Sequence, residues 1–328
     1  MACHFTGEDV RAAYERIKDH VRRTPLDDSL YLGTEECRYR FKLESQQLGR
    51  SFKIRGVLNV LLQLAPAQLE RGVGTVSTGN HAIALAYAAK QLGIECVVIV
   101  PVGTSRTKLD RMRLYGARIM TMGGSYDEAL VLGRNYIDCN ELVYVDPGKN
   151  DPVSCAGHGT VGYEIALLHP SVDTIVVPVG GGGLITGVAV GARALRPDMR
   201  IVGVQPSACP SVYQSLNDQF CYTTYPLTGE TVCDSVAGGI GILAYEMLPG
   251  LVDEWIVVDE PEVRSAVRFM VMEERILLEG ASAMAVAAVR EYPERVGGSS
   301  VAIVVSGGNA DGKRLASVLN EADDSLDI

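Results

Sequence analysis

The sequence predicts an α/β protein with two open, twisted and mostly parallel β-sheets, each covered by helices on both faces. Short apolar runs rich in valine and isoleucine alternate with segments of helical periodicity, which is typical of βαβ units. Several runs, such as those at 95–101, 174–179 and 301–306, are nearly uninterrupted, as strands buried on both faces require. A composition of 35 glycines and only 6% aromatic residues suits glycine-turned βαβ units better than a β-sandwich.

The predicted elements follow one another along the chain. The charged N-terminal segment predicts an amphipathic helix starting after Thr6, rather than a signal peptide. Strands are expected at residues 39–44, 74–78, 95–101, 117–122, 174–179, 200–205, 254–259 and 301–306. Helices are expected at residues 52–66, 80–92, 105–115, 125–137, 157–168, 184–195, 260–275 and 279–291.

The strands fall into two groups, which predicts two domains. One group precedes residue 125 and another follows residue 170, and the segment 143–160, rich in Pro, Gly and Asp, is interpreted as a crossing between the two. We expect a large domain of residues 1–73 and 149–328 and a small domain of residues 74–148. A ligand would bind in the cleft between them.

Composition excludes several classes of function. A net charge of −10 without a lysine or arginine run argues against a nucleic-acid partner, and no apolar run is long enough to span a membrane. The eight cysteines are scattered with no C-x-x-C pair, which predicts reduced thiols and a cytoplasmic protein. The five histidines show no ligand spacing, so no metal site is expected.

The glycine run Gly180–Gly183 follows the strand at 174–179 and precedes a helix, which predicts a phosphate cradle at the helix N-terminus. The alternative is a tight turn, which needs fewer glycines. The Rossmann G-x-G-x-x-G and the Walker A patterns are absent, and Gln205 ends the next strand where a dinucleotide site would want an acid. The ligand predicted for the glycine run is therefore a small phosphate monoester.

Three further segments lie at strand ends. In "STGNH", Ser77 or Thr78 can cap a helix whose free N–H groups would hold a carboxylate, although this is also an ordinary helix start. Ser306 closes the last strand and could bond a ring nitrogen or form an ordinary turn. Lys53 lies in a first helical turn after a cap at Ser51, where burial and the dipole would lower its pKa, unless its stem snorkels to solvent. A neutral Lys53 beside a phosphate cradle, the side-chain amide of Asn80 and the hydroxyl of Ser306 predicts a pyridoxal phosphate site.

In this order and spacing, "SFKIRG", "STGNHAIALAYAAK", "PVGGGGLITG", "LLEGASAMA" and "VSGGN" resemble the fold-type II pyridoxal-phosphate enzymes, the tryptophan synthase β-like superfamily. Within it the chain is similar to the threonine/serine dehydratases and serine racemases, and "STGNH" with "DSVAGGIG" resembles dehydratases of hydroxyectoine breakdown. The resemblance spans about residues 5–315. A C-terminal regulatory domain, as in biosynthetic threonine deaminases, is not expected.

The resemblance implies a role for each motif. Lys53 is the Schiff-base lysine and the base for the α-proton, and it forms the catalytic set with Ser77 and Thr78. The implied cofactor-binding residues are Lys53, Phe52 beside the ring, Asn80 at the ring hydroxyl, Gly180, Gly181, Gly182, Gly183 and Leu184 at the phosphate, Ser306 at the pyridine nitrogen, and Glu279. The implied substrate-binding residues are Ser77, Thr78, Asn80, His81, His158 and Ser235.

Some positions depart from the subgroup. Thr78 stands where racemases carry a serine, His158 where the family has glutamine, and Ser235 where a glycine lies against the cofactor. Gln205 and Ser211 replace acids at the metal site of serine racemases, so activation by a divalent ion there is not expected.

The resemblance implies a homodimeric lyase that converts a β-hydroxy amino acid to a 2-oxo acid and ammonia. Its substrate is L-threonine or L-serine by default, with hydroxyaspartate or a hydroxyectoine-derived compound as other candidates. The alternative is a serine or aspartate racemase.

Overall fold

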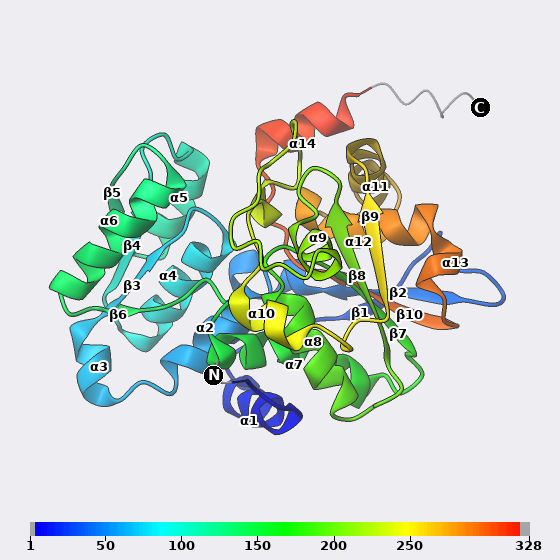
Figure 1. Ribbon diagram of the computed structural model, residues 1–328, viewed down its shortest axis with the longest axis horizontal. Helices are drawn as coiled ribbons and strands as arrows, with labels where there is room; N and C mark the ends of the chain where they lie inside the picture. The colour runs from blue at the N-terminus through cyan, green and yellow to red at the C-terminus, as the bar shows by residue number, and fades with distance from the viewer. Residues whose placement is uncertain (1–3, 322–328) are drawn as a thin grey trace.

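The computed structural model describes residues 4–321 and shows two lobes, each built around one β-sheet (Figure 1). The large lobe holds a six-stranded sheet in the order β1-β2-β10-β7-β8-β9. All neighbouring strands in it are parallel except β1 and β2. The strands are β1 (Leu26–Asp28), β2 (Arg38–Leu43), β7 (Thr174–Pro178), β8 (Arg200–Pro206), β9 (Glu254–Val258) and β10 (Ser300–Val305).

The small lobe holds a four-stranded sheet in the order β5-β4-β3-β6, and all its pairs are parallel. Its strands are β3 (Val73–Val76), β4 (Cys96–Val100), β5 (Arg118–Thr121) and β6 (Val143–Tyr144). Two mostly parallel sheets confirm the predicted fold class, and a strand overlaps each segment predicted to hold one. The short strands β1 and β6 were missed because two or three residues are too few for a readable apolar run.

Helices cover both faces of the large sheet. Alternate residues of β7 face opposite sides: Val176 joins a core with helices α11 and α12, whereas Ile175 and Val177 join a core with α7, α8 and α10. The helices of the large lobe are α1 (Gly7–Ile17), α2 (Lys53–Leu61), α7 (Pro152–Leu168), α8 (Gly183–Arg193), α9 (Ser211–Asn217), α10 (Ile242–Met247), α11 (Glu260–Met272), α12 (Gly280–Glu291), α13 (Pro293–Val296) and α14 (Gly312–Leu319).

In the small lobe, α4 packs on one side of the sheet and α6 on the other. The helices here are α3 (Pro66–Arg71), α4 (Asn80–Leu92), α5 (Arg106–Leu114) and α6 (Tyr126–Cys139). The part of the chain that the structure describes also contains three 3₁₀ turns: η1 (Glu44–Gln46), η2 (Leu48–Arg50) and η3 (Asp234–Val236). Within residues 4–321, no helix combines the length and apolar character that crossing a membrane takes.

Two helix predictions need correction. The helix expected at 52–66 ends at Leu61, and a separate helix begins at Pro66, because proline fits the first position of a helix but not its interior. Helix α7 begins at Pro152 rather than at 157, since Asp151 caps it through the backbone N–H groups of Val153 and Ser154. The segment interpreted as a crossing thus contains β6 and the N-terminal half of α7.

Candidate active site

The carboxyl ends of β2, β10 and β7 lie at one edge of the large sheet, because these strands are parallel neighbours. Each end leads to a residue singled out from the sequence: β2 to Lys53, β10 to Ser306 and β7 to the glycine run. The Phe52 backbone N–H donates to the Ser306 carbonyl at 3.0 Å, and Ser51 forms an antiparallel bridge with Gly307. The lysine and the serine are therefore held side by side.

Lys53 is the first residue of α2 and is half-buried. Its Nζ donates to the Pro147 carbonyl at 2.6 Å and lies 5.0 Å from the centre of the Phe52 ring. Burial lowers the pKa of Lys53 to about 8, although Cys155, Asp146 and Glu279 act in the opposite direction. A useful fraction of neutral amine therefore exists near neutral pH. The predicted cap at Ser51 is wrong: Ser51 is in extended backbone, and Phe52 is the N-cap.

The glycine run is packed against neighbouring backbone. Gly182 has a φ of +95°, and a Cβ on Gly183 would lie 1.9 Å from the Gly148 carbonyl oxygen, so neither position accepts a side chain. No side chain in the described part of the chain caps α8, which starts at Gly183. The N–H groups of its first turn, including that of Leu184, are thus available to an anion. These residues fit the phosphate of pyridoxal phosphate.

The start of α4 presents a second set of N–H groups. Its N-cap is Gly79, and no described side chain caps it, so the predicted capping by Ser77 or Thr78 is wrong. The Ser77 Oγ instead accepts from the Gly79 N–H at 3.4 Å. His81 turns inward: its Nε2 bonds the Val145 carbonyl at 3.1 Å, and burial lowers its pKa to about 4, which keeps it neutral.

Asn80 and Glu279 join the two lobes. The Asn80 Nδ2 donates to the Glu279 Oε1 at 2.7 Å. Burial raises the pKa of Glu279 to about 7, while the hydrogen bond from Asn80 acts against it. On the large lobe, the buried Ser306 Oγ lies 3.0 Å from the Ser282 Oγ, within hydrogen-bond distance. The amide of Asn80 and the carboxyl of Glu279 lie beside Gly307, the residue that follows Ser306. This set of polar groups suits a substituted pyridine ring.

Three residues that depart from the subgroup, Ser235, His158 and Thr78, differ in their position relative to the site. Ser235, in η3, lines a cavity together with Gly79, Asn80 and Glu279, so the structure brings it to the site. His158, on α7, is buried behind Phe52, with the two ring centres 4.8 Å apart in an edge-on arrangement. Neither ring nitrogen of His158 has a hydrogen-bond partner among the described residues. Thr78 is half-buried in the turn before α4.

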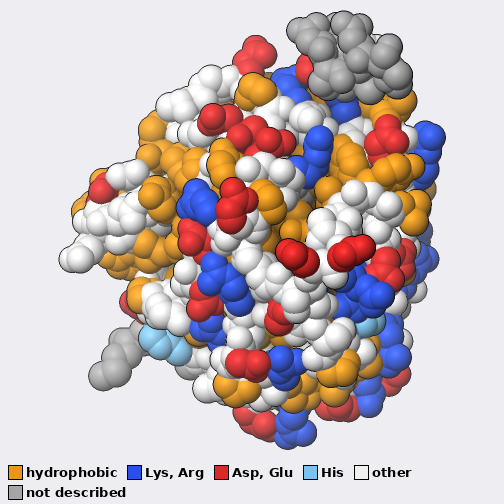
Figure 2. Space-filling model, turned by 90° about the vertical axis from the view of Figure 1, so that its right-hand side faces the viewer, with side chains coloured by type: hydrophobic (Ala, Val, Ile, Leu, Met, Phe, Trp, Pro, Cys, Tyr) orange, Lys and Arg blue, Asp and Glu red, His pale blue; other side chains and the backbone are white. Residues whose placement is uncertain are grey.

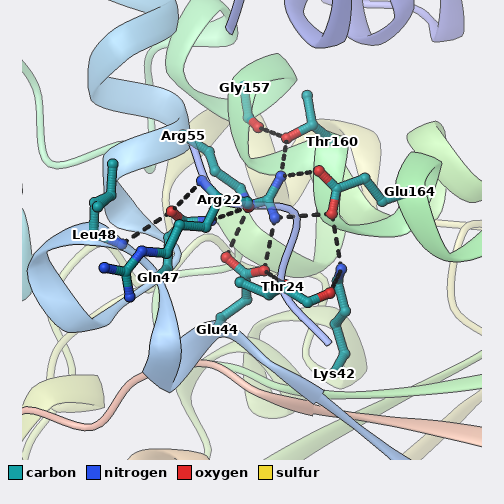
Figure 3. Close-up of polar contacts among 10 residues, drawn as sticks. All are labelled: Arg22, Thr24, Lys42, Glu44, Gln47, Leu48, Arg55, Gly157, Thr160 and Glu164. Carbon is teal, nitrogen blue, oxygen red and sulfur yellow. Dashed lines mark hydrogen bonds and ion pairs between the residues drawn. The ribbon is translucent and has the colours of Figure 1, made fainter. Parts of the chain in front are cut away.

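A buried ion cluster anchors the helix that carries Lys53 (Figure 3). Arg55 donates five hydrogen bonds, two to Glu44 of η1, two to Glu164 of α7 and one to Thr160. Lys42 of β2 adds a bond from its Nζ to Glu164 at 2.8 Å. Burial alone would raise the pKa of Glu164, but Arg55 and Lys42 lower it to about 2. The cluster fixes α2 against β2 and α7.

Sequence reasoning missed three participants. The Pro147 carbonyl that accepts from Lys53 is a backbone group and leaves no side-chain pattern. Asn309 belongs to the motif "VSGGN" but was given no role, although its Nδ2 donates to the Asn80 Oδ1 at 2.7 Å. Arg111 bonds Asn309 from the small lobe, and its charged helix has the pattern of an ordinary solvent-facing surface.

The site is that of a pyridoxal-phosphate enzyme, and the comparison with known families agrees. The model of the family "Pyridoxal-phosphate dependent enzyme" matches residues 17–307, and the chain belongs to this family. It is 36% identical over 320 residues to the L-threonine ammonia-lyase of Thermotoga maritima, covering 97% of this chain and 79% of that protein. The chain is a pyridoxal-phosphate-dependent lyase of the threonine dehydratase type.

Solved structures show the same fold. Maize serine racemase superposes with a TM-score of 0.88 at 30% identity, covering 97% of each chain. The processed form of threonine deaminase isoform 2 from Solanum lycopersicum superposes with a TM-score of 0.87 at 27% identity, covering 98% of this chain and 96% of that one. The predicted family, subgroup and cofactor are confirmed.

Proposed function

We propose that the chain removes the β-hydroxyl and the amino group of a β-hydroxy amino acid, releasing a 2-oxo acid and ammonia. L-threonine or L-serine is the default substrate, and hydroxyaspartate or a hydroxyectoine-derived compound is the further candidate. The half-buried Lys53, with its pKa lowered to about 8 next to two uncapped helix N-termini, carries this proposal. The similarity to an L-threonine ammonia-lyase supports the reaction type.

In the proposed reaction each group has one task. Bound pyridoxal phosphate supplies the electron sink that lets the α-C–H bond of the amino acid break. The neutral amine of Lys53 takes the α-proton. The first turn of α8, after Gly180–Gly183, holds the phosphate, and the first turn of α4 holds the substrate carboxylate with Ser77, Thr78 and Asn80.

The remaining residues orient and complete the site. Ser306 faces the pyridine nitrogen as a neutral group, and Phe52 packs beside the ring. The β-hydroxyl takes up a proton and leaves as one water molecule. One water molecule is consumed when the released enamine is hydrolysed to the 2-oxo acid and ammonia. Glu279 belongs to the cofactor site through Asn80.

We further propose that Ser235 and His158 select the substrate side chain. Ser235 lines the cavity beside Asn80, whereas His158 acts from behind Phe52. His81 contributes its backbone at the start of α4, since its ring bonds Val145.

A panel of serine, threonine, allo-threonine, hydroxyaspartate and phenylserine, scored for 2-oxo acid and ammonia, tests the substrate class. Release from none of them, and from no hydroxyectoine-derived β-hydroxy amino acid added to the panel, would contradict the proposed reaction.

Racemisation of serine or aspartate is the second candidate, supported by the similarity to maize serine racemase. The Thr78 hydroxyl could serve as a proton carrier on the face opposite Lys53, but its methyl group crowds that face. Elimination is therefore favoured. Chiral analysis of the products from L-serine separates the two, and substantial D-serine with little pyruvate would reverse the order.

We propose a homodimeric, cytoplasmic protein with the domain boundaries expected from the sequence. The free state of all seven cysteines in the described chain supports a reducing compartment. Lysine and arginine lie interspersed with acidic side chains on the face shown in Figure 2, which supports a small-molecule rather than a nucleic-acid partner. The strands β3 to β6 between Val73 and Tyr144 support a small domain at about 74–148, against which α3 packs from the N-terminal side. Light scattering of the purified protein tests the dimer.

A further inference from the structure

The side-chain amide of Asn309 has one orientation. Its Nδ2 donates to the Gly49 carbonyl at 2.9 Å and to the Asn80 Oδ1 at 2.7 Å. Its Oδ1 accepts from the Nη1 of Arg111 at 2.5 Å. A carbonyl only accepts and a guanidinium only donates, so exchanging the nitrogen and oxygen of Asn309 would break contacts at both ends.

The orientation of Asn80 follows from that of Asn309. The Asn80 Oδ1 accepts from Asn309, which leaves its Nδ2 facing Glu279 at 2.7 Å. The donor of Asn80 is thus presented to the site, and its acceptor is turned away. In the proposed function this donor meets the ring oxygen of the cofactor, where an acceptor would instead repel it.

Arg111 supplies the charged end of this chain of hydrogen bonds. It lies on α5 in the small lobe and is half-buried, whereas Gly49 and Asn309 belong to the large lobe. The cavity between the lobes is lined by Arg111, Asn309, Asn80 and Glu279 together. Charge-assisted bonds are about twice as strong as neutral ones, so Arg111 fixes Asn309 more firmly than a neutral partner could.

We propose that Arg111 is a positioning residue that, through Asn309, holds the amide of Asn80 with its donor toward the cofactor ring. This inference rests on the proposed function of the site. Without Arg111, the Asn309 Oδ1 loses its charged partner, and the Gly49 carbonyl alone holds the amide in this orientation. The contact from Asn309 that orients Asn80 is then held less firmly.

Three variants test the chain. Arg111→Met keeps the apolar stem and removes the donors, Arg111→Lys keeps the charge, and Asn309→Asp keeps the acceptor for Arg111 but removes the donor to Asn80. We expect Arg111→Met and Asn309→Asp each to weaken pyridoxal phosphate binding by about tenfold, since a hydrogen bond to a charged group is worth about that factor. Arg111→Lys should recover part of the loss.

The matched control is Arg113→Met on the same helix, because Arg113 is exposed and pairs with Asp110 on the surface. It should bind the cofactor as the wild type does. The affinity and the absorption maximum of the bound cofactor are measured without substrate, and the melting temperature of each variant is recorded. A purely structural role would lower the melting temperature while leaving the absorption maximum in place.

The outcomes separate this inference from the proposed function. A shifted absorption maximum and weaker binding in both Arg111→Met and Asn309→Asp support the inference, even if no amino acid yields a 2-oxo acid. Wild-type elimination combined with unchanged cofactor binding in Arg111→Met would overturn the inference alone. A wild-type protein that binds no pyridoxal phosphate would overturn both.

Discussion

Replacing Arg55 by methionine should destabilise the protein strongly. All five N–H donors of Arg55 are engaged, and its side chain is fully buried with the carboxylates of Glu44 and Glu164. Methionine preserves much of the volume but leaves two buried carboxylates opposite Lys42 alone. Removing one partner of a buried ion pair costs about 3–5 kcal/mol of unfolding free energy.

The assay is thermal and urea unfolding of the apo-protein. At about 2 °C per kcal/mol for a chain of this size, the melting temperature should fall by about 6–10 °C. The exposed Arg11, which pairs with Glu8 on the surface of α1, supplies the control: Arg11→Met should change stability little. A fall in Arg55→Met no larger than in this control would refute the reasoning.

The pH dependence adds a second test of the same cluster. The folded pKa of Glu164, about 2, lies below its ordinary value near 4.5, so its contribution is present above pH 4.5 and is lost as the pH falls toward 2. In Arg55→Met that depression is largely removed, and protonation relieves the uncompensated charge. The deficit of the variant relative to wild type should therefore shrink between pH 7 and pH 4. A deficit constant over this range would contradict the account.

Two further predictions concern the cofactor site. Burial lowers the pKa of Lys53 to about 8. The rate at which the apo-protein binds pyridoxal phosphate should therefore rise with pH around a midpoint near 8. A midpoint near 10.5, the ordinary lysine value, would contradict this prediction. Gly183→Ala should reduce cofactor affinity by at least tenfold, since its Cβ would meet the Gly148 carbonyl, whereas Gly312→Ala, with nothing within 4 Å, should bind normally. Equal affinities of Gly183→Ala and Gly312→Ala in a cofactor titration would contradict this prediction, because they would show that the backbone around Gly148 moves aside.

Much of the fold and the centre of the site could be predicted from the sequence. Uninterrupted apolar runs identified the long strands, because parallel strands buried on both faces need them. Lys53, the glycine run and Ser306 were found because each follows such a strand, and parallel strand ends meet at one edge.

The contacts between lobes could not be predicted in this way. Arg111 and Asn309 are 198 residues apart, and a polar residue on a charged helix carries no signal of a distant partner. The capping predictions failed for a related reason. Ser77 and Thr78 are good caps by residue type, but the chain places Gly79 at the N-cap and leaves the first turn of α4 open.

The most direct test of the account compares wild type with Lys53→Ala, both incubated with pyridoxal phosphate. The wild type should show the visible absorption band of lysine-bound cofactor and release 2-oxo acid from L-threonine or L-serine. Lys53→Ala should lose both, while its melting temperature in the absence of cofactor stays close to that of the wild type. A variant that keeps the band, or a wild type that remains colourless with saturating cofactor, would contradict the assignment of Lys53 and with it the proposed function.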